Sequence, residues 1–153
     1  MTSLELKVPP LVLVLVVAGA MWVASGSALR LDVPDSVRIC GAVTLGLIGS
    51  AIAISGTQAF RRAKTTVNPT APENASALVR TGIYGVTRNP MYLGMLIVLA
   101  GWSVFLACAL ALPVLPVFAL YLGRFQIAPE ERMLEKLFGE DYSDYKSKVR
   151  RWL

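Results

Sequence analysis

The stretch that decides the fold of this chain reads Arg88-Asn89-Pro90-Met91-Tyr92-Leu93-Gly94. A polar, basic segment precedes it, and after it no charged residue occurs until Arg124. A polar cluster at the mouth of an apolar span is where a membrane protein can hold a charged small molecule against a lipid-like one. A second polar cluster, Glu130-Glu131, follows just past the end of the same apolar run. We predict that the two clusters meet at one site on the membrane surface.

The composition indicates a membrane protein. The 153 residues are 55% hydrophobic and 16% charged, whereas soluble domains carry about 25% charged residues. Long stretches of the sequence also contain no charged residue. A helix needs about 20 apolar residues to cross a bilayer, and these stretches are long enough to supply them. We therefore predict one all-α domain over residues 1–153. Its four transmembrane helices are expected at about 9–29, 39–60, 91–107 and 108–123.

The two last predicted spans form a hairpin with a turn near Cys108. Pro113 and Pro116 predict a kink in the fourth span, because each removes a backbone donor. The second span is rich in small residues such as Gly46 and Gly49. Small residues let helices approach closely in lipid, so we expect this span to offer a helix–helix contact face.

Basic residues after the second span predict how the chain is oriented. Segment 61–88 holds five basic residues and one acid, and the positive-inside rule makes such a loop cytoplasmic. With four spans, both termini and the site would lie on the cytoplasmic side. Within the loop, residues 68–72 read Asn-Pro-Thr-Ala-Pro, which predicts turns.

From Ala128 the chain becomes amphipathic. Pro129-Glu130-Glu131 predicts the first turn of a new helix, and Gly139 predicts its end. Aromatic and apolar residues then recur at three- and four-residue steps between bases: Tyr142, Tyr145, Val149 and Trp152. We predict a C-terminal amphipathic helix with aromatics toward lipid and bases toward anionic headgroups. Membrane lipids are thus expected partners, and nucleic acid is not.

The residue inventory limits the chemistry. There is no histidine, which is the commonest metal ligand and general base. Cys40 and Cys108 stand in or beside apolar spans, away from any cluster of possible ligands, so no metal site is predicted. The spans also lack the embedded carboxylate that proton-coupled transporters usually need, which argues against a transporter.

Polar residues collect instead at one predicted membrane face. They are Tyr84, Arg88, Asn89, Tyr92, Arg124, Gln126, Glu130 and Glu131. An arginine can bind a carboxylate through a bidentate fork, and a glutamate can bind an ammonium group, so the set suits a zwitterion such as an amino-acid moiety. Alternatively, Arg88 pairs with Glu130 or Glu131 and only ties the loop to the C-terminal helix. The charges alone leave both interpretations open.

The spacing around Arg88 is more specific than its charge. The run 82–94 resembles the signature of the isoprenylcysteine carboxyl methyltransferase and phospholipid methyltransferase superfamily. That signature is arginine, histidine or asparagine, proline, any residue, tyrosine, any residue, glycine. The superfamily's second element, a Glu-Glu pair leading to Phe-Gly and spaced tyrosines, is matched by Glu130-Glu131, Phe138-Gly139, Tyr142 and Tyr145. The resemblance covers about residues 78–152.

The resemblance implies a membrane-embedded methyltransferase that uses S-adenosylmethionine and lies outside the soluble Rossmann class. It assigns the cofactor contacts to Tyr84, Arg88, Asn89, Pro90, Tyr92, Gly94, Glu130, Glu131, Tyr142 and Tyr145. Methyl transfer needs alignment of the reactants and exclusion of water rather than a metal. We expect Arg88, Glu131 and Arg151 to serve the reaction, with Arg88 or Arg151 orienting an anionic acceptor.

The acceptor stays open at this point. The isoprenylcysteine enzymes usually carry histidine where Asn89 stands, and asparagine still donates and accepts hydrogen bonds but carries no charge. A prenylated cysteine, a phospholipid amine, or a small thiol or acid all fit, and a site at the lipid boundary favours a lipophilic acceptor. The oligomeric state is not predicted.

Two other functions remain open. Membrane sterol and steroid reductases, which use NADPH, are similar at an arginine-histidine-proline-asparagine-tyrosine motif and a tyrosine-rich C-terminus, but here Met91 replaces that asparagine. A small non-enzymatic membrane protein is also possible, because Arg88 and Glu131 can be structural partners. Titration with S-adenosylhomocysteine and NADPH distinguishes the methyltransferase, the reductase and the non-enzymatic protein.

Overall fold

The computed structural model describes residues 5–26, 29–64 and 76–153. Within these ranges the regular elements are helical, apart from one isolated antiparallel bridge between Arg30 and Cys108. The predicted all-α class is therefore confirmed for this part of the chain. The turns predicted for 68–72 lie outside the described residues.

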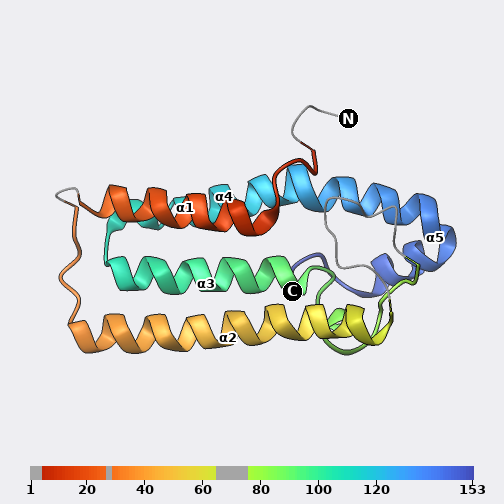
Figure 1. Cartoon of the computed structure of the whole chain (residues 1–153), viewed down its shortest axis with the longest axis horizontal. Helices are drawn as coiled ribbons and strands as arrows, with labels where there is room; N and C mark the ends of the chain where they lie inside the picture. The colour runs from red at the N-terminus through yellow and green to blue at the C-terminus, as the bar shows by residue number, and fades with distance from the viewer. Residues whose placement is uncertain (1–4, 27–28, 65–75) are drawn as a thin grey trace.

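Helices α1, α3 and α2 lie side by side along the long axis of the molecule, with α4 beside α1 (Figure 1). In chain order the helical elements are α1 (Pro10–Ser25), α2 (Asp35–Arg62), η2 (Gly82–Gly85), α3 (Pro90–Leu106), η3 (Ala109–Ala111), α4 (Val114–Leu122), η4 (Gly123–Ile127) and α5 (Ala128–Lys148). The central position of α3 explains its many buried residues, because both of its sides are covered.

Two helical runs among the described residues are long and apolar enough to span a membrane, Asp35–Arg62 and Ala109–Lys148. Helices α1 and α3 are apolar but shorter, with 16 and 17 residues. At about 1.5 Å per residue, a helix of the latter length covers about 25 Å of a hydrocarbon core about 30 Å thick. Four complete crossings therefore stay a prediction.

The outer surface of these helices is apolar. Large exposed side chains include Leu11, Leu15, Trp22 and Val23 on α1, Val43, Leu47 and Ile54 on α2, and Val117 and Leu120 on α4. Soluble monomers rarely expose contiguous apolar surface on this scale. The distribution indicates a surface that faces lipid.

Small residues join α2 to α3, as the sequence predicted. A Cβ added at Gly94 would lie 2.4 Å from the carbonyl oxygen of Gly49, and a Cβ added at Gly49 would lie 2.6 Å from that of Gly94. The two backbones touch at a distance that only glycine permits. This contact fixes the first part of α3, and with it the Arg88 motif, against the middle of α2.

The hairpin turn lies where the sequence predicted it. Helix α3 ends at Leu106, the following Ala107 has a left-handed φ of 44°, and Cys108 is extended. The predicted kink in the fourth span is wrong, because α4 begins only after Pro113. Pro116 therefore falls in its first turn, where a missing N–H loses no helical hydrogen bond.

Helix α5 starts at Ala128, with Glu130 and Glu131 in its first turn as predicted, but it does not follow a loop. Helix α4 continues through the π-helical turn η4 into α5 without a break in the chain's helical course. Pro129 has no N–H for the carbonyl of Phe125, and that oxygen accepts the Leu6 N–H instead, at 3.1 Å. The predicted interruption of the helix at Gly139 is confirmed, since the φ of 52° and ψ of −121° at Gly139 are not helical. The chain bends back there (Figure 1).

The start of the described chain is fastened to the junction of α4 and α5. The Glu5 carboxylate pairs with Arg124 at 3.0 Å and with Arg132 at 2.8 Å. The Gln126 amide nitrogen donates to the Val8 carbonyl at 2.7 Å. These contacts hold the helix that carries Glu130 and Glu131 in a fixed relation to α1.

Candidate active site

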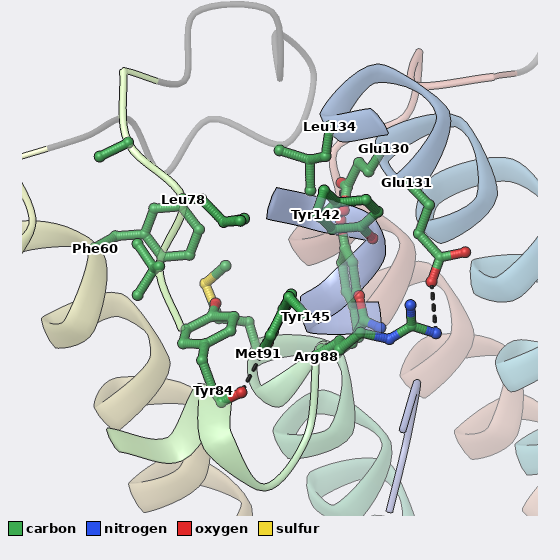
Figure 2. Close-up of a pocket in the computed structure, with 14 residues that line it drawn as sticks. Phe60, Leu78, Tyr84, Arg88, Met91, Glu130, Glu131, Leu134, Tyr142 and Tyr145 are labelled. Atoms are coloured by element: carbon green, nitrogen blue, oxygen red, sulfur yellow. Dashed lines mark hydrogen bonds and ion pairs between the residues drawn. The ribbon is translucent and has the colours of Figure 1, made fainter. Parts of the chain in front are cut away.

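A cavity opens where α2 ends, α3 begins and α5 passes over both (Figure 2). Its volume is about 90 Å³, which is below the range of about 300–1,000 Å³ typical of sites that enclose a whole small molecule. Its polar lining comes from both sequence motifs and comprises Tyr84, Arg88, Asn89, Tyr92, Glu130, Glu131, Tyr142 and Tyr145. The two motifs thus face one space.

The remaining predicted site residues lie outside the lining. Pro90 is buried at the first position of α3, and a Cβ added at Gly56 would lie 3.1 Å from its ring. Gly94 contacts Gly49, as described above. Arg151 lies behind Glu131 rather than in the wall. Pro90 and Gly94 therefore position the motif by packing α3 on α2.

Two arginines share Glu131. Arg88 Nη2 lies 3.2 Å from Glu131 Oε1, and both side chains are nearly buried. Arg151 contacts the same carboxylate with two nitrogens, Nε to Oε1 at 3.2 Å and Nη2 to Oε2 at 2.5 Å. The ion pair that would tie the loop to the C-terminal helix is therefore present.

Arg88 is only partly used by this pair. Its Nε and Nη1 atoms are buried and have no hydrogen-bond partner within the part of the chain that the structure describes. A buried donor without a partner costs about 1–3 kcal/mol, and more when the group is charged. These two nitrogens are therefore free to donate hydrogen bonds to a ligand that enters the cavity.

The last residues of the chain are bound to the motif around Arg88. The Arg88 N–H donates to the Arg150 carbonyl at 3.0 Å, and the Asn89 side-chain amide donates to the Arg151 carbonyl at 2.9 Å. The Thr87 hydroxyl donates to the same Arg151 oxygen at 3.3 Å. Asn89 thus uses one amide donor to position the C-terminal segment.

The tyrosines of α5 face the cavity, so the prediction that they turn toward lipid is wrong. Tyr142 and Tyr145 are 2% and 5% exposed, and the Tyr145 hydroxyl donates to the Tyr84 carbonyl at 2.7 Å. The Tyr84 ring in turn packs edge-on against Phe60, with centroids 5.3 Å apart. Both tyrosines follow the non-helical Gly139, where the chain bends back (Figure 1), and both line the cavity.

Burial changes the acidity of the groups on α5, which lie beyond the apolar, membrane-spanning part of the run. It raises the pKa of the Tyr145 phenol to about 12, partly offset by Arg88, so this hydroxyl stays a neutral donor. Burial, with Glu131 nearby, raises the pKa of Glu130 to about 8, although the hydrogen bond from Tyr92 opposes this shift. Glu130 is therefore mostly protonated at neutral pH unless a cation approaches.

Several lining residues were not predicted from the sequence. They are the apolar members of the wall, Phe60, Ala77, Leu78, Val79, Met91 and Leu134. A signal existed for two of them: Phe60 is the last residue before the basic cluster at the end of α2, and Leu134 belongs to the apolar stripe of α5. Ala77, Leu78 and Val79 lie on a loop without periodicity, and Met91 lies in the first turn of α3.

The fold and this cavity define a helical membrane protein with a charged, nearly buried site at one end. The chain matches the phospholipid methyltransferase family over residues 37–141. It belongs to this family of membrane methyltransferases, and the resemblance found in the sequence is confirmed. A 63-residue stretch is also 48% identical to an uncharacterized protein of Haemophilus influenzae, covering 41% of this chain and all of that protein.

Proposed function

We propose that this chain is an S-adenosylmethionine-dependent methyltransferase that acts on a lipophilic acceptor, isoprenylcysteine carboxylate-like or related. The observation that carries the proposal is Arg88. Its side chain is only 10% exposed, it lines the cavity, and two of its nitrogens lack a partner among the described residues. Such a group favours a ligand that brings a carboxylate.

The cavity residues fit the amino-acid end of this cofactor. A carboxylate suits the unpartnered Nε and Nη1 of Arg88, because hydrogen bonds from a guanidinium to a carboxylate are charge-assisted and strong. An ammonium or sulfonium suits Glu130, which lines the same cavity. The apolar and aromatic wall, with Phe60 and Leu134, offers the kind of surface on which a nucleoside packs.

S-adenosylmethionine supplies a methyl group whose leaving group is a neutral thioether. The chain's own residues then have two tasks: to hold the two reactants in line and to exclude water, which would compete as a nucleophile. The walls that α2, α3 and α5 give the cavity serve the second task. A thiolate or carboxylate acceptor needs no general base, which agrees with a chain that has no histidine.

The exposed apolar surface of α1, α2 and α4 supports a lipophilic acceptor, because a lipid-like molecule can approach the site within the membrane. The basic residues Arg61 and Arg62 at the end of α2 support a site on the cytoplasmic side.

Calorimetric titration of the detergent-solubilised full chain tests this proposal. S-adenosylhomocysteine should bind at one site per chain, and NADPH should not. Transfer of a labelled methyl group from S-adenosylmethionine into a membrane extract should then label a lipophilic product, whose identification names the acceptor. Binding of NADPH alone would contradict the proposal and favour a reductase, and binding of neither would favour a non-enzymatic protein.

A further inference from the structure

We propose that Arg151 is a positioning residue that keeps Arg88 available for the ligand by holding Glu131 away from it. This inference rests on the proposed function, because the ligand in question carries a carboxylate. It differs from a role for Arg151 in orienting the acceptor, and the two roles predict different measurements.

The geometry at Glu131 is unequal. Arg151 contacts both carboxylate oxygens, with Nη2 to Oε2 at 2.5 Å and Nε to Oε1 at 3.2 Å. Arg88 reaches only Oε1, through the single nitrogen Nη2 at 3.2 Å. The paired fork is the stronger arrangement of a guanidinium on a carboxylate. Arg151 therefore takes the contact that Arg88 would otherwise make.

Burial separates the tasks of the two arginines. The Arg88 side chain is 10% exposed and lines the cavity, whereas the Arg151 side chain is 41% exposed and does not line it. Arg88 is thus the group placed to meet a ligand, and it has two donors left over within the described residues. Arg151 acts from behind, through Glu131.

The charge count at the site points the same way. With Arg151 present, Glu131 faces two guanidinium groups, which leaves the trio with one net positive charge for an anion. Without Arg151, Glu131 and Arg88 form a neutral pair, and Glu131 Oε2 is free to accept a second bond from Arg88. The carboxylate of a ligand would then compete with the Glu131 carboxylate for Arg88, and the ligand would bind more weakly.

The backbone holds Arg151 where this task requires it. Its carbonyl accepts hydrogen bonds from Asn89 at 2.9 Å and from Thr87 at 3.3 Å. Both donors flank Arg88 in the motif. The position of Arg151 is therefore set by the same segment whose arginine it keeps free.

Titration of S-adenosylhomocysteine into the detergent-solubilised full chain tests the inference in four forms: wild type, Arg151→Met, Glu131→Gln and the double variant. Arg151→Met should weaken binding about tenfold or more, since hydrogen bonds to charged groups contribute more than those between neutral groups. In the Glu131→Gln background the same substitution should change the affinity less than about threefold, because no carboxylate remains to capture Arg88. Arg150→Met is the matched control, since only an exposed neighbouring side chain changes and its carbonyl stays in place.

Each outcome decides. An unchanged affinity in Arg151→Met overturns the inference, and so does an equal loss in both backgrounds, which would mean that Arg151 contacts the ligand itself. A raised KM for the acceptor with unchanged S-adenosylhomocysteine affinity would assign Arg151 to the acceptor instead. If Arg151→Met does not fold, Arg151→Lys keeps the charge but not the fork and should show a smaller loss; wild-type affinity in that variant would also overturn it. No binding by the wild type would contradict the proposed function, and the inference with it.

Discussion

Arg88 serves two partners at the residue scale. It gives one nitrogen to Glu131 and keeps two for the cavity, and its backbone N–H binds the C-terminal segment. The two interpretations of its charge, structural tie and ligand contact, are therefore compatible. Arg88 can serve both roles because Arg151 donates two hydrogen bonds to the Glu131 carboxylate, so Arg88 contacts it with one nitrogen only.

Glu130 gives the site a pH dependence. Burial raises the pKa of Glu130 to about 8, so the side chain carries a proton below that pH. A cationic ligand pairs with the ionised carboxylate, so Glu130 must lose this proton when the ligand binds. The affinity for S-adenosylmethionine should therefore rise between pH 7 and pH 8.5, with proton release on binding. Calorimetry in buffers of different ionisation enthalpy measures both. Glu130→Gln should remove the slope, and a flat profile in the wild type would contradict this role.

At the scale of elements, the seam between α2 and α3 positions the motif. Gly94→Ala should destabilise the protein by about 1–3 kcal/mol, as overpacked substitutions do, because its Cβ would lie 2.4 Å from the Gly49 carbonyl oxygen. Thermal unfolding in detergent measures the change. The control is Gly46→Ala on α2, whose Cβ would meet nothing within 4 Å. Equal stability of the two variants would refute the packing role of Gly94.

The bend in α5 turns the tyrosines inward. Gly139 has a φ of 52°, and an alanine there should cost about 1–3 kcal/mol of strain. Because Tyr142 and Tyr145 follow the bend, Gly139→Ala should also weaken S-adenosylhomocysteine binding in the same titration. Gly123→Ala is the matched control, since its backbone is helical and its Cβ would meet nothing within 4 Å. Unchanged S-adenosylhomocysteine binding in Gly139→Ala would show that the bend does not position residues of the site.

At the scale of the whole molecule, much of the architecture could be predicted because lipid restricts what a chain can do. Stretches without charge had to become helices, and the hairpin between the two motifs returned Glu131 to the end of the molecule where Arg88 lies. Two polar clusters that flank one hairpin have few other places to meet. The end of the α5 segment at Gly139 was likewise visible in the sequence.

Other features had no signal in the sequence. A period of three to four residues fits tyrosines that face lipid as well as tyrosines that face a cavity, so the direction of Tyr142 and Tyr145 depended on the angle of the bend. Asn89 binds a backbone carbonyl of Arg151, and backbone partners leave no pattern in the residue types. The role of Glu5 depends on a distant contact with Arg124 and Arg132.

The central claim is that Arg88 and the Glu130-Glu131 pair form one cofactor site, and titration of S-adenosylhomocysteine into Arg88→Met tests it most directly. Arg151 still holds Glu131 in this variant, so the fold should survive while the free donors are gone. We predict one site per chain in the wild type and in the Arg150→Met control, and an affinity at least about tenfold weaker in Arg88→Met. Wild-type affinity in a folded Arg88→Met variant would contradict the account.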